Sequence, residues 1–188
     1  MIIYIHGFAS SGFGQKAQEF KKYFKDEIIT ISLSNIPILA IHTLEELITY
    51  SLKKGEKVFL IGSSLGGFYS LYLANKYNLK AVLINPALNP RKTLTRFYSF
   101  GLVSNYFDGS KFEITREQLD SLQKYEVSLI QNSKNILCFM QKGDEIIDYK
   151  EVELRLKDCE LILEEGGNHT FANIDRHFLK IDDFFSNK

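Results

Sequence analysis

Cysteine and proline are scarce in this chain of 188 residues. The two cysteines, Cys138 and Cys159, do not form a CxxC pair and have no cluster of histidines near them. This argues against a disulfide framework and against a zinc site, and we expect both side chains to be reduced, inert thiols. The three prolines, Pro37, Pro86 and Pro90, all fall at predicted loops.

An excess of one charge and long hydrophobic runs are also missing. Lysine plus arginine and aspartate plus glutamate both number 23, so no overall field would attract nucleic acid or anionic lipid. The apolar run at residues 1–5 is too short for a membrane span and lacks the basic segment of a signal peptide. We therefore expect a cytoplasmic protein that binds neither nucleic acid nor membrane. Its 45% hydrophobic residues suffice for the core of a single domain over 1–188.

The hydrophobic pattern alternates between strand-like and helix-like segments. Between the strand-like runs, apolar residues recur at helical spacing, and a stripe from Phe171 to Phe185 predicts a closing helix. This alternation predicts an α/β fold: an open, mostly parallel sheet of about six strands with helices on both faces. The predicted strands are 2–5, 28–31, 57–61, 80–84, 136–141 and 160–163.

Residues 86–132 depart from this alternation. Strand-like runs stop there, and aromatic residues gather among glycine and asparagine. Thr115 and Gln118 have the spacing of a capping box, which predicts a helix after them. We expect a small, cap-like helical excursion over the active face, whose aromatic residues form either its own core or a wall for an acyl group. These aromatic residues are Phe97, Tyr98, Phe100, Tyr106, Phe107 and Phe112.

The segment 62–66 reads Gly-Ser-Ser-Leu-Gly, which is the Gly-x-Ser-x-Gly pattern of a nucleophile elbow. It follows an apolar run that ends at Ile61 and precedes a stretch with helical spacing. A turn sharp enough to lift a serine hydroxyl clear of a sheet has no room for bulky side chains beside it, and the flanking glycines meet that need. Ser64 is the predicted nucleophile, whereas Ser63 should point away from the cleft.

A serine nucleophile needs a histidine to take its proton and a carboxylate to orient that histidine. Asp144 lies just past the predicted strand 136–141, and His169 lies in a loop of small residues past 160–163. Because the carboxyl ends of parallel strands meet at one edge of a sheet, both side chains should approach Ser64. The chain order of serine, acid and histidine is that of the α/β-hydrolases.

Asp148 is the alternative acid, because it lies four residues beyond Asp144 and could also reach the sheet edge. Asp144 is favoured since it follows the strand end directly and precedes the apolar pair Ile146 and Ile147. Glu145, between the acid and this pair, should point outward.

The first predicted strand ends in His-Gly-Phe at residues 6–8. In an α/β-hydrolase the corresponding loop gives one backbone N–H to the oxyanion hole, and the residue after the nucleophile gives the other. Those donors would be Phe8 and Leu65. His6 is predicted to orient this loop by hydrogen bonding, and His42 and His177 to be solvated or half-buried residues without a role as ligands.

Five segments of the chain occur in a characteristic order. They are Tyr4-Ile5-His6-Gly7-Phe8, Gly62-Ser63-Ser64-Leu65-Gly66-Gly67, Asn85-Pro86-Ala87, Gly143-Asp144-Glu145-Ile146-Ile147-Asp148-Tyr149 and Glu165-Gly166-Gly167-Asn168-His169. Together they resemble, at similar spacing and over nearly the whole chain, the compact bacterial YqiA-like esterases of the α/β-hydrolase superfamily. The resemblance implies hydrolysis of a small-molecule ester or thioester through Ser64, Asp144 and His169, with no metal and no organic cofactor. Residues 87–132 resemble the family only loosely and should set substrate choice.

A nucleotide-binding function has two weak indications near the N-terminus. Gly7 and Gly12 have the spacing of half a P-loop, but Phe13 and Gly14 stand where lysine and serine or threonine must bind phosphate and magnesium. A dinucleotide-like pattern from Gly12 to Ala17 starts too far after the strand and has no ribose-binding acid after the next one. Because both patterns lack residues that nucleotide binding needs, the sequence disfavours this function.

Two further alternatives keep the fold. An acyltransferase would pass the acyl group to an acceptor other than water, a choice that depends on water access to the closed site. A non-catalytic binding protein would not be expected to retain all three catalytic residue types. Acyl chain length, leaving group and oligomeric state stay open.

Overall fold

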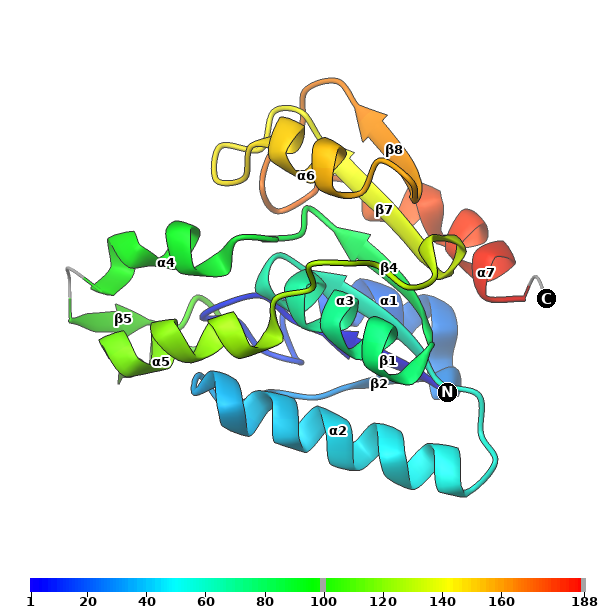
Figure 1. Cartoon of the computed structure of the whole chain (residues 1–188), viewed down its shortest axis with the longest axis horizontal. Coiled ribbons are helices and arrows are strands. Elements are labelled where there is room, and N and C mark those ends of the chain that lie inside the picture. The colour runs from blue at the N-terminus through cyan, green and yellow to red at the C-terminus, as the bar shows by residue number, and fades with distance from the viewer. Residues whose placement is uncertain (99–100, 187–188) are drawn as a thin grey trace.

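The computed structural model describes residues 1–98 and 101–186 and contains a six-stranded, fully parallel sheet with the order β2-β1-β3-β4-β7-β8 (Figure 1). Its strands are β1 (Ile2–Ile5), β2 (Ile28–Thr30), β3 (Phe59–Ser63), β4 (Lys80–Ile84), β7 (Ile136–Gln141) and β8 (Glu160–Glu164). The α-helices are α1 (Gln15–Phe24), α2 (Pro37–Lys53), α3 (Leu65–Tyr77), α4 (Pro90–Tyr98), α5 (Arg116–Ser121), α6 (Tyr149–Arg155) and α7 (Phe178–Ser186). Short 3-10 helices are η1 (Lys25–Glu27), η2 (Leu122–Tyr125), η3 (Ser133–Asn135) and η4 (Ile174–His177). The predicted fold class is confirmed.

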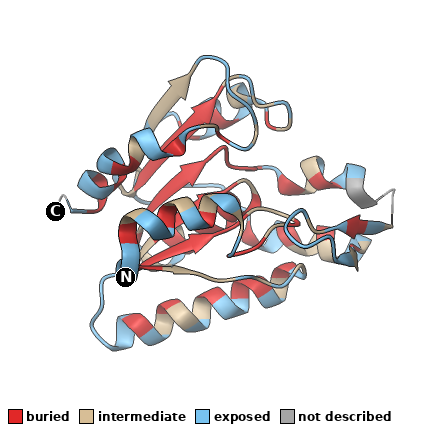
Figure 2. Ribbon diagram, turned by 180° about the vertical axis from the view of Figure 1, so that it is seen from behind, coloured by how far each residue is buried: buried red, intermediate tan, exposed pale blue. Residues whose placement is uncertain are grey.

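Each strand sends alternate side chains to opposite faces of the sheet, and helices cover both faces. In β1, Ile3 and Ile5 pack with residues of α2 and α3, whereas Ile2 and Tyr4 pack with residues of α1 and α7. The central strands are buried on both sides, which explains their nearly continuous apolar sequence (Figure 2). This packing fixes the strand ends that carry the polar loops.

The strand register aligns those ends. Ile5, the last residue of β1, pairs with Gly62, and Ser63, the last residue of β3, pairs with Ile84 at the end of β4. β7 and β8 end side by side at Gln141 and Glu164. The loops after β1, β3, β4, β7 and β8 therefore leave the sheet at one edge.

Several predicted boundaries were wrong. β2 ends at Thr30 instead of residue 31, β8 ends at Glu164 instead of 163, and β3 begins at Phe59 instead of 57. β3 extends to Ser63, two residues beyond the predicted end, because this segment pairs in full with β4. Phe171 does not lie on the closing helix: its backbone φ is +57°, and helical structure begins only at Ile174. Phe171 is nevertheless buried, 6.3 Å between ring centroids from Phe139, so the apolar stripe reflects burial in a loop as well as on a helix.

The excursion contains an antiparallel hairpin that the sequence pattern did not predict. Its strands, β5 (Leu102–Ser104) and β6 (Lys111–Glu113), have three residues each, too few for a periodic pattern to be recognised. The predicted capping box before α5 is present: Thr115 Oγ1 accepts from Gln118 N, and Gln118 Oε1 accepts from Thr115 N. The hairpin contributes a buried side chain, Val103, to the core.

The hairpin is tied to the loop after β1. Asn105 Nδ2 donates to Ser10 O at 3.2 Å, and Tyr106 N donates to Ala9 O at 2.8 Å. The excursion therefore lies at the carboxyl edge of the sheet. Within the described ranges 1–98 and 101–186, no helix is both long enough and apolar enough to cross a bilayer.

Candidate active site

Ser64 occupies a strained turn between β3 and α3. Its φ is +55° and its ψ is −118°, a combination that costs an L-residue energy and that occurs at functional turns. The turn is held by its own backbone: Ser64 N donates to Ile84 O at 3.0 Å, and Ser64 O accepts from Ala87 N at 3.0 Å. The chain after β4 thus fixes the conformation that exposes the Ser64 hydroxyl.

Glycines make the elbow possible because its backbone contacts neighbouring backbone directly. A Cβ at Gly66 would lie 2.0 Å from the carbonyl oxygen of Ile5, and one at Gly62 would lie 2.2 Å from the carbonyl oxygen of Gly66. Neither distance is compatible with a side chain. Gly66 is therefore required by the close approach of α3 to the end of β1, and Gly62 by the close approach of β3 to the first turns of α3.

The structure brings Ser64, His169 and Asp144 into one hydrogen-bonded chain. Ser64 Oγ lies 2.9 Å from His169 Nε2, and His169 Nδ1 lies 2.8 Å and 3.0 Å from the two carboxylate oxygens of Asp144. The Asp144 side chain is fully buried, whereas 21% of the His169 side chain is exposed. Since a carboxylate accepts the proton on Nδ1, Nε2 is left as an acceptor that faces the Ser64 hydroxyl.

Asp144 is positioned by its own loop. Its Oδ1 accepts the backbone N–H groups of Ile146 and Ile147, both at 2.8 Å, so the buried charge is satisfied on two sides. Asp148 lies one turn further on and caps α6 by accepting from Lys150 N at 3.0 Å. Of the two candidate acids, only Asp144 contacts the histidine.

Glu145 points outward, as expected, and its side chain also contacts the histidine loop. Its carboxylate Oε2 accepts the backbone N–H of His169 at 3.0 Å. The residue is exposed, as its charge requires, but the side chain bends back over the histidine loop. An outward residue of one loop can thus reach a backbone N–H of the neighbouring loop, a contact that sequence spacing does not reveal.

Two polar residues at strand ends anchor the His169 loop, and sequence reasoning gave neither a role. Asn85, fully buried after β4, donates from Nδ2 to Asn168 O at 2.9 Å and to His169 O at 3.2 Å. Gln141, the last residue of β7, accepts at Oε1 from Asn168 N and Ala172 N, both at 3.1 Å. Their residue type could have indicated this role, since both are polar residues at the carboxyl end of otherwise apolar strands.

The loop after β1 lies against Ser64. A Cβ at Gly7 would be 3.2 Å from Ser64 Cβ and 3.8 Å from Ser64 Oγ, so Gly7 lies beside the Ser64 hydroxyl. Leu65 is the first residue of α3, where backbone N–H groups have no partner within the helix and attract negative charge. Phe8 and Leu65 thus flank Ser64 from the two segments expected to supply oxyanion donors.

His6 holds this loop, as predicted. Its Nε2 accepts from Leu33 N at 2.9 Å, so Nδ1 carries the proton and donates to Gly7 O at 2.8 Å. Burial lowers the pKa of His6 below its usual value, an effect that the bond to Gly7 partly opposes, and the imidazole is neutral at pH 7. His42 is exposed on α2, and His177 is half-buried and pairs with Glu164 at 2.6 Å.

The two cysteines fit their description as unreactive thiols. Cys138 is buried in β7, and burial raises the pKa of its thiol well above the usual value. Burial, with a smaller effect of Asp158, raises the pKa of Cys159 to about 11. Because the thiolate is the nucleophilic form, neither sulfur is activated at neutral pH.

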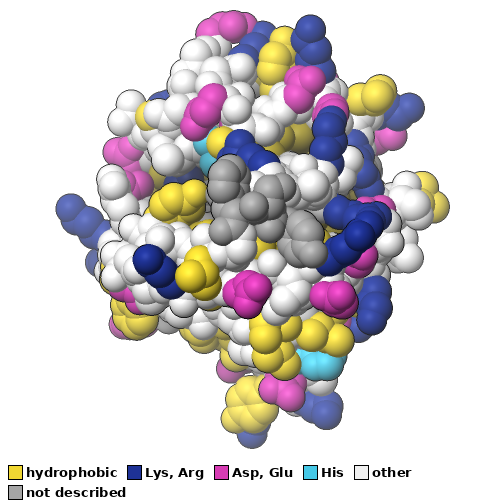
Figure 3. Space-filling view, turned by 90° about the vertical axis from the view of Figure 1, so that its left-hand side faces the viewer, with side chains coloured by type: hydrophobic (Ala, Val, Ile, Leu, Met, Phe, Trp, Pro, Cys, Tyr) yellow, Lys and Arg dark blue, Asp and Glu magenta, His cyan; other side chains and the backbone are white. Residues whose placement is uncertain are grey.

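The aromatic residues of the excursion divide into two groups. Phe112 contacts Phe8 edge to face, with ring centroids 5.6 Å apart, and so packs on the oxyanion loop. Tyr106 and Phe107 are exposed at the hairpin tip, and Phe107 lies 6.4 Å from the exposed ring of Phe13. Phe100 lies outside the described residues, as do the side chains at 97 and 98. Seen from the excursion's end of the molecule, hydrophobic side chains are interspersed with side chains of both charges (Figure 3).

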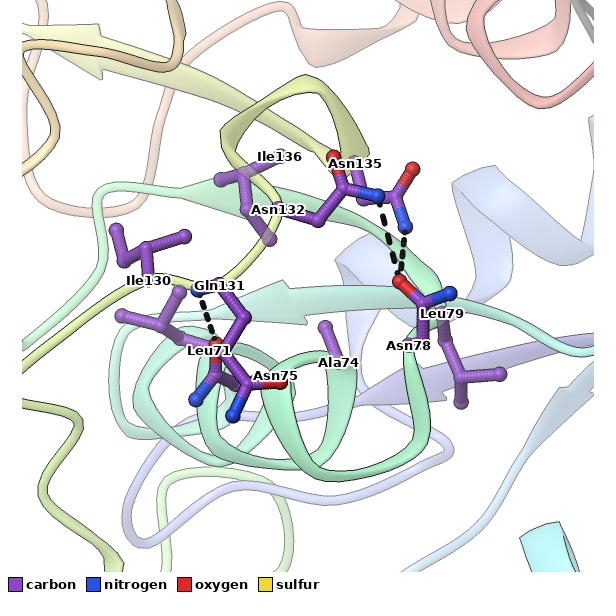
Figure 4. A pocket seen from close by; sticks show the side chains of 10 residues that line it. All are labelled: Leu71, Ala74, Asn75, Asn78, Leu79, Ile130, Gln131, Asn132, Asn135 and Ile136. Carbon is purple, nitrogen blue, oxygen red and sulfur yellow. Dashed lines mark hydrogen bonds between the residues drawn. The ribbon is translucent and has the colours of Figure 1, made fainter.

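A small cavity lies at the opposite edge of the sheet, where β4 and β7 begin (Figure 4). Its volume of about 10 Å³ is room for a single water molecule. There, Asn78 Oδ1 accepts from Asn132 Nδ2 at 3.3 Å and from Asn135 Nδ2 at 3.1 Å. These contacts join the end of α3 to the segment before β7, at the edge of the sheet opposite Ser64, so this cavity is a structural feature of the fold.

Comparison with known proteins gives a matching family, relatives in that family and solved structures of similar fold. The family described as "Uncharacterised protein family (UPF0227)" matches residues 1–186. A UPF0227 protein of Serratia proteamaculans is 28% identical over 190 aligned positions that cover 98% of each chain. Among solved structures, a putative hydrolase from Agrobacterium vitis is similar with a TM-score of 0.74 and 20% identity, covering 98% of this chain and 87% of that one. The structure of Est1E from Butyrivibrio proteoclasticus with ferulic acid bound has a TM-score of 0.71 and 15% identity, covering 98% of this chain and 86% of that one.

Proposed function

The chain belongs to the UPF0227 family, the YqiA-like group that its motifs resemble, and we propose that it is a serine hydrolase that cleaves small-molecule carboxylic esters or thioesters. The observation that carries the proposal is the unbroken chain of hydrogen bonds from Ser64 through His169 to Asp144, with Ser64 at a backbone angle used by nucleophile elbows. The α/β-hydrolase fold shared with a putative hydrolase and with Est1E supports it.

In the acylation step, Ser64 Oγ attacks the carbonyl carbon of the substrate while His169 Nε2 takes the hydroxyl proton. The carbonyl oxygen becomes an oxyanion, and the N–H groups of Phe8 and Leu65 stabilise it by hydrogen bonding. The bond from carbon to the leaving oxygen or sulfur then breaks. His169 returns the proton to the leaving group, which departs as an alcohol or thiol.

In the deacylation step, a water molecule replaces the leaving group. His169 Nε2 removes a proton from this water, whose oxygen attacks the acyl carbon and forms a second oxyanion in the same hole. The bond between the acyl carbon and Ser64 Oγ breaks, Ser64 regains its proton from His169, and the carboxylic acid is released. The buried carboxylate of Asp144 stabilises the imidazolium in both steps.

We further propose that residues 1–188 form one catalytic domain in which 86–132 serves as a cap. Its hairpin is hydrogen-bonded to Ala9 and Ser10, next to the oxyanion loop, and Phe112 packs on Phe8. A cap attached at this point borders the space where an acyl group must enter. Substitutions in the cap would therefore change which acyl groups are accepted.

The test is active-site labelling with a fluorophosphonate, which reacts with activated serines, combined with hydrolysis of p-nitrophenyl acetate. We expect one adduct, located on Ser64 by peptide mass spectrometry. Ser64→Ala should remove the label and lower kcat at least about a thousandfold. Ser51→Ala is the matched control, because Ser51 lies at the end of α2 beside Met1, at the opposite edge of the sheet from Ser64. An adduct that persists in Ser64→Ala would refute the proposed nucleophile.

A further inference from the structure

Lys16, on the first turn of α1, joins the chain segments that carry the nucleophile and the base. Its Nζ donates to Ser63 Oγ at 3.3 Å and also to the backbone carbonyl oxygen of Thr170. Ser63 directly precedes Ser64, and Thr170 directly follows His169. One ammonium group therefore connects the two loops whose separation sets the distance between Ser64 Oγ and His169 Nε2.

We infer that Lys16 is a positioning residue for the reaction proposed above, which holds the His169 loop against the nucleophile elbow through its charged hydrogen bonds. The inference rests on that proposed function. Lys16 acts through its neighbours, since its Nζ donates to Ser63 and Thr170, which flank the reacting residues in the chain. Asn85 and Gln141 hold the same loop with uncharged groups, so Lys16 differs from them in having a charge that pH can remove.

The surroundings of Lys16 explain why a cation is retained there. On its own helix Glu19 attracts the ammonium, and from the loop after β7 so does Asp144. The Tyr4 phenol on β1 shares the Ser63 hydroxyl with Lys16, and the His169 imidazole is next to Thr170 in the chain. The positive charge of Lys16 thus lies close to the carboxylate of Asp144.

Burial lowers the pKa of Lys16 to about 8, against the weaker opposing effects of Glu19 and Asp144. Below this pH the group is an ammonium and its bonds to Ser63 and Thr170 are charge-assisted. Above it the neutral amine keeps two N–H groups, so the bonds weaken without disappearing. Activity should therefore fall above about pH 8 to a lower plateau.

The experiment compares Lys16→Met with Lys22→Met, which removes an exposed lysine on the same helix. For p-nitrophenyl acetate at pH 7 we expect kcat of Lys16→Met to fall about tenfold, the value of one charge-assisted hydrogen bond, with KM changed less than about twofold. The decline above pH 8 should be absent from Lys16→Met and present in Lys22→Met. A kcat and a pH profile equal to those of the wild type would overturn the inference.

Lys16→Gln provides a second test if the methionine variant does not fold. Glutamine can still donate to a carbonyl oxygen but carries no charge at any pH. Its kcat should match the high-pH plateau of the wild type and should not decline above pH 8. If kcat of Lys16→Gln fell above pH 8 as it does in the wild type, the role of Lys16 would be refuted. Failure of the proposed function looks different, because the wild type would then neither take a fluorophosphonate on Ser64 nor turn over the ester.

Discussion

Replacing Asp144 by asparagine should nearly abolish turnover while leaving the fold intact. Asp144 Oδ1 accepts from Ile146 N and Ile147 N, and an asparagine can keep both bonds only by placing its own carbonyl oxygen there. Its NH₂ group then occupies the position of Oδ2, 2.8 Å from His169 Nδ1. A donor at that position opposes a proton on Nδ1. The carbonyl oxygen 3.0 Å from Nδ1 already accepts from Ile146 N and Ile147 N and carries less negative charge than a carboxylate oxygen, so the tautomer with its proton on Nε2 is favoured.

A histidine protonated at Nε2 cannot take a proton from Ser64. Histidine in this tautomer would donate to Ser64 Oγ across the 2.9 Å contact and so oppose the attack. The same substitution in a serine-protease triad lowers kcat about 10⁴-fold for this reason, which corresponds to about 5.5 kcal/mol of barrier. We expect a loss of that size here. KM should change little, because the geometry is preserved.

The assay is kcat and KM for p-nitrophenyl acetate, with thermal unfolding as a check on folding. Asp148→Asn is the matched control: asparagine is as good a helix cap as aspartate, and Asp148 contacts Lys150 N instead of the histidine. Its kcat should stay within about twofold of the wild type. If Asp144→Asn retained more than about a tenth of wild-type kcat, or if Asp148→Asn were the more damaging change, the assignment of the acid would be wrong.

Two further predictions concern stability. Gly66→Ala places a Cβ 2.0 Å from the Ile5 carbonyl oxygen, so it should lower the free energy of unfolding by about 1 to 3 kcal/mol. Tm should fall by about 2 to 4 °C for each kcal/mol, and an unchanged melting curve would contradict the close contact. Folding lowers the pKa of His6 below its unfolded value of 6.5. The neutral imidazole therefore contributes fully to the free energy of unfolding above pH 6.5, and this contribution is lost as the pH falls through the pKa of the folded state. Urea unfolding at about pH 7.5 and about pH 5.5 should show this loss in the wild type and less of it in His6→Gln, whereas equal losses would exclude His6 as the source.

The local pattern of the sequence predicted much of the fold. Alternating apolar runs and helical stripes gave six parallel strands and helices on both faces, because strands buried on two sides must be apolar throughout. The hairpin at 102–113 escaped prediction, since three-residue strands show no period and this pair is fixed by bonds to Ala9 and Ser10, more than ninety positions away.

Motif order alone determined which residue types the candidate site contains, because an elbow serine, an acid and a histidine each follow a strand at the same edge. Tertiary structure decided which atoms meet. Distances across the sheet edge decide that Asp144 is the partner of His169. They also decide which side chains bond to the histidine loop, namely those of Asn85, Gln141, Glu145 and Lys16. Side-chain chemistry can be read from single positions, but such distances follow only from how the strands are ordered and aligned in space.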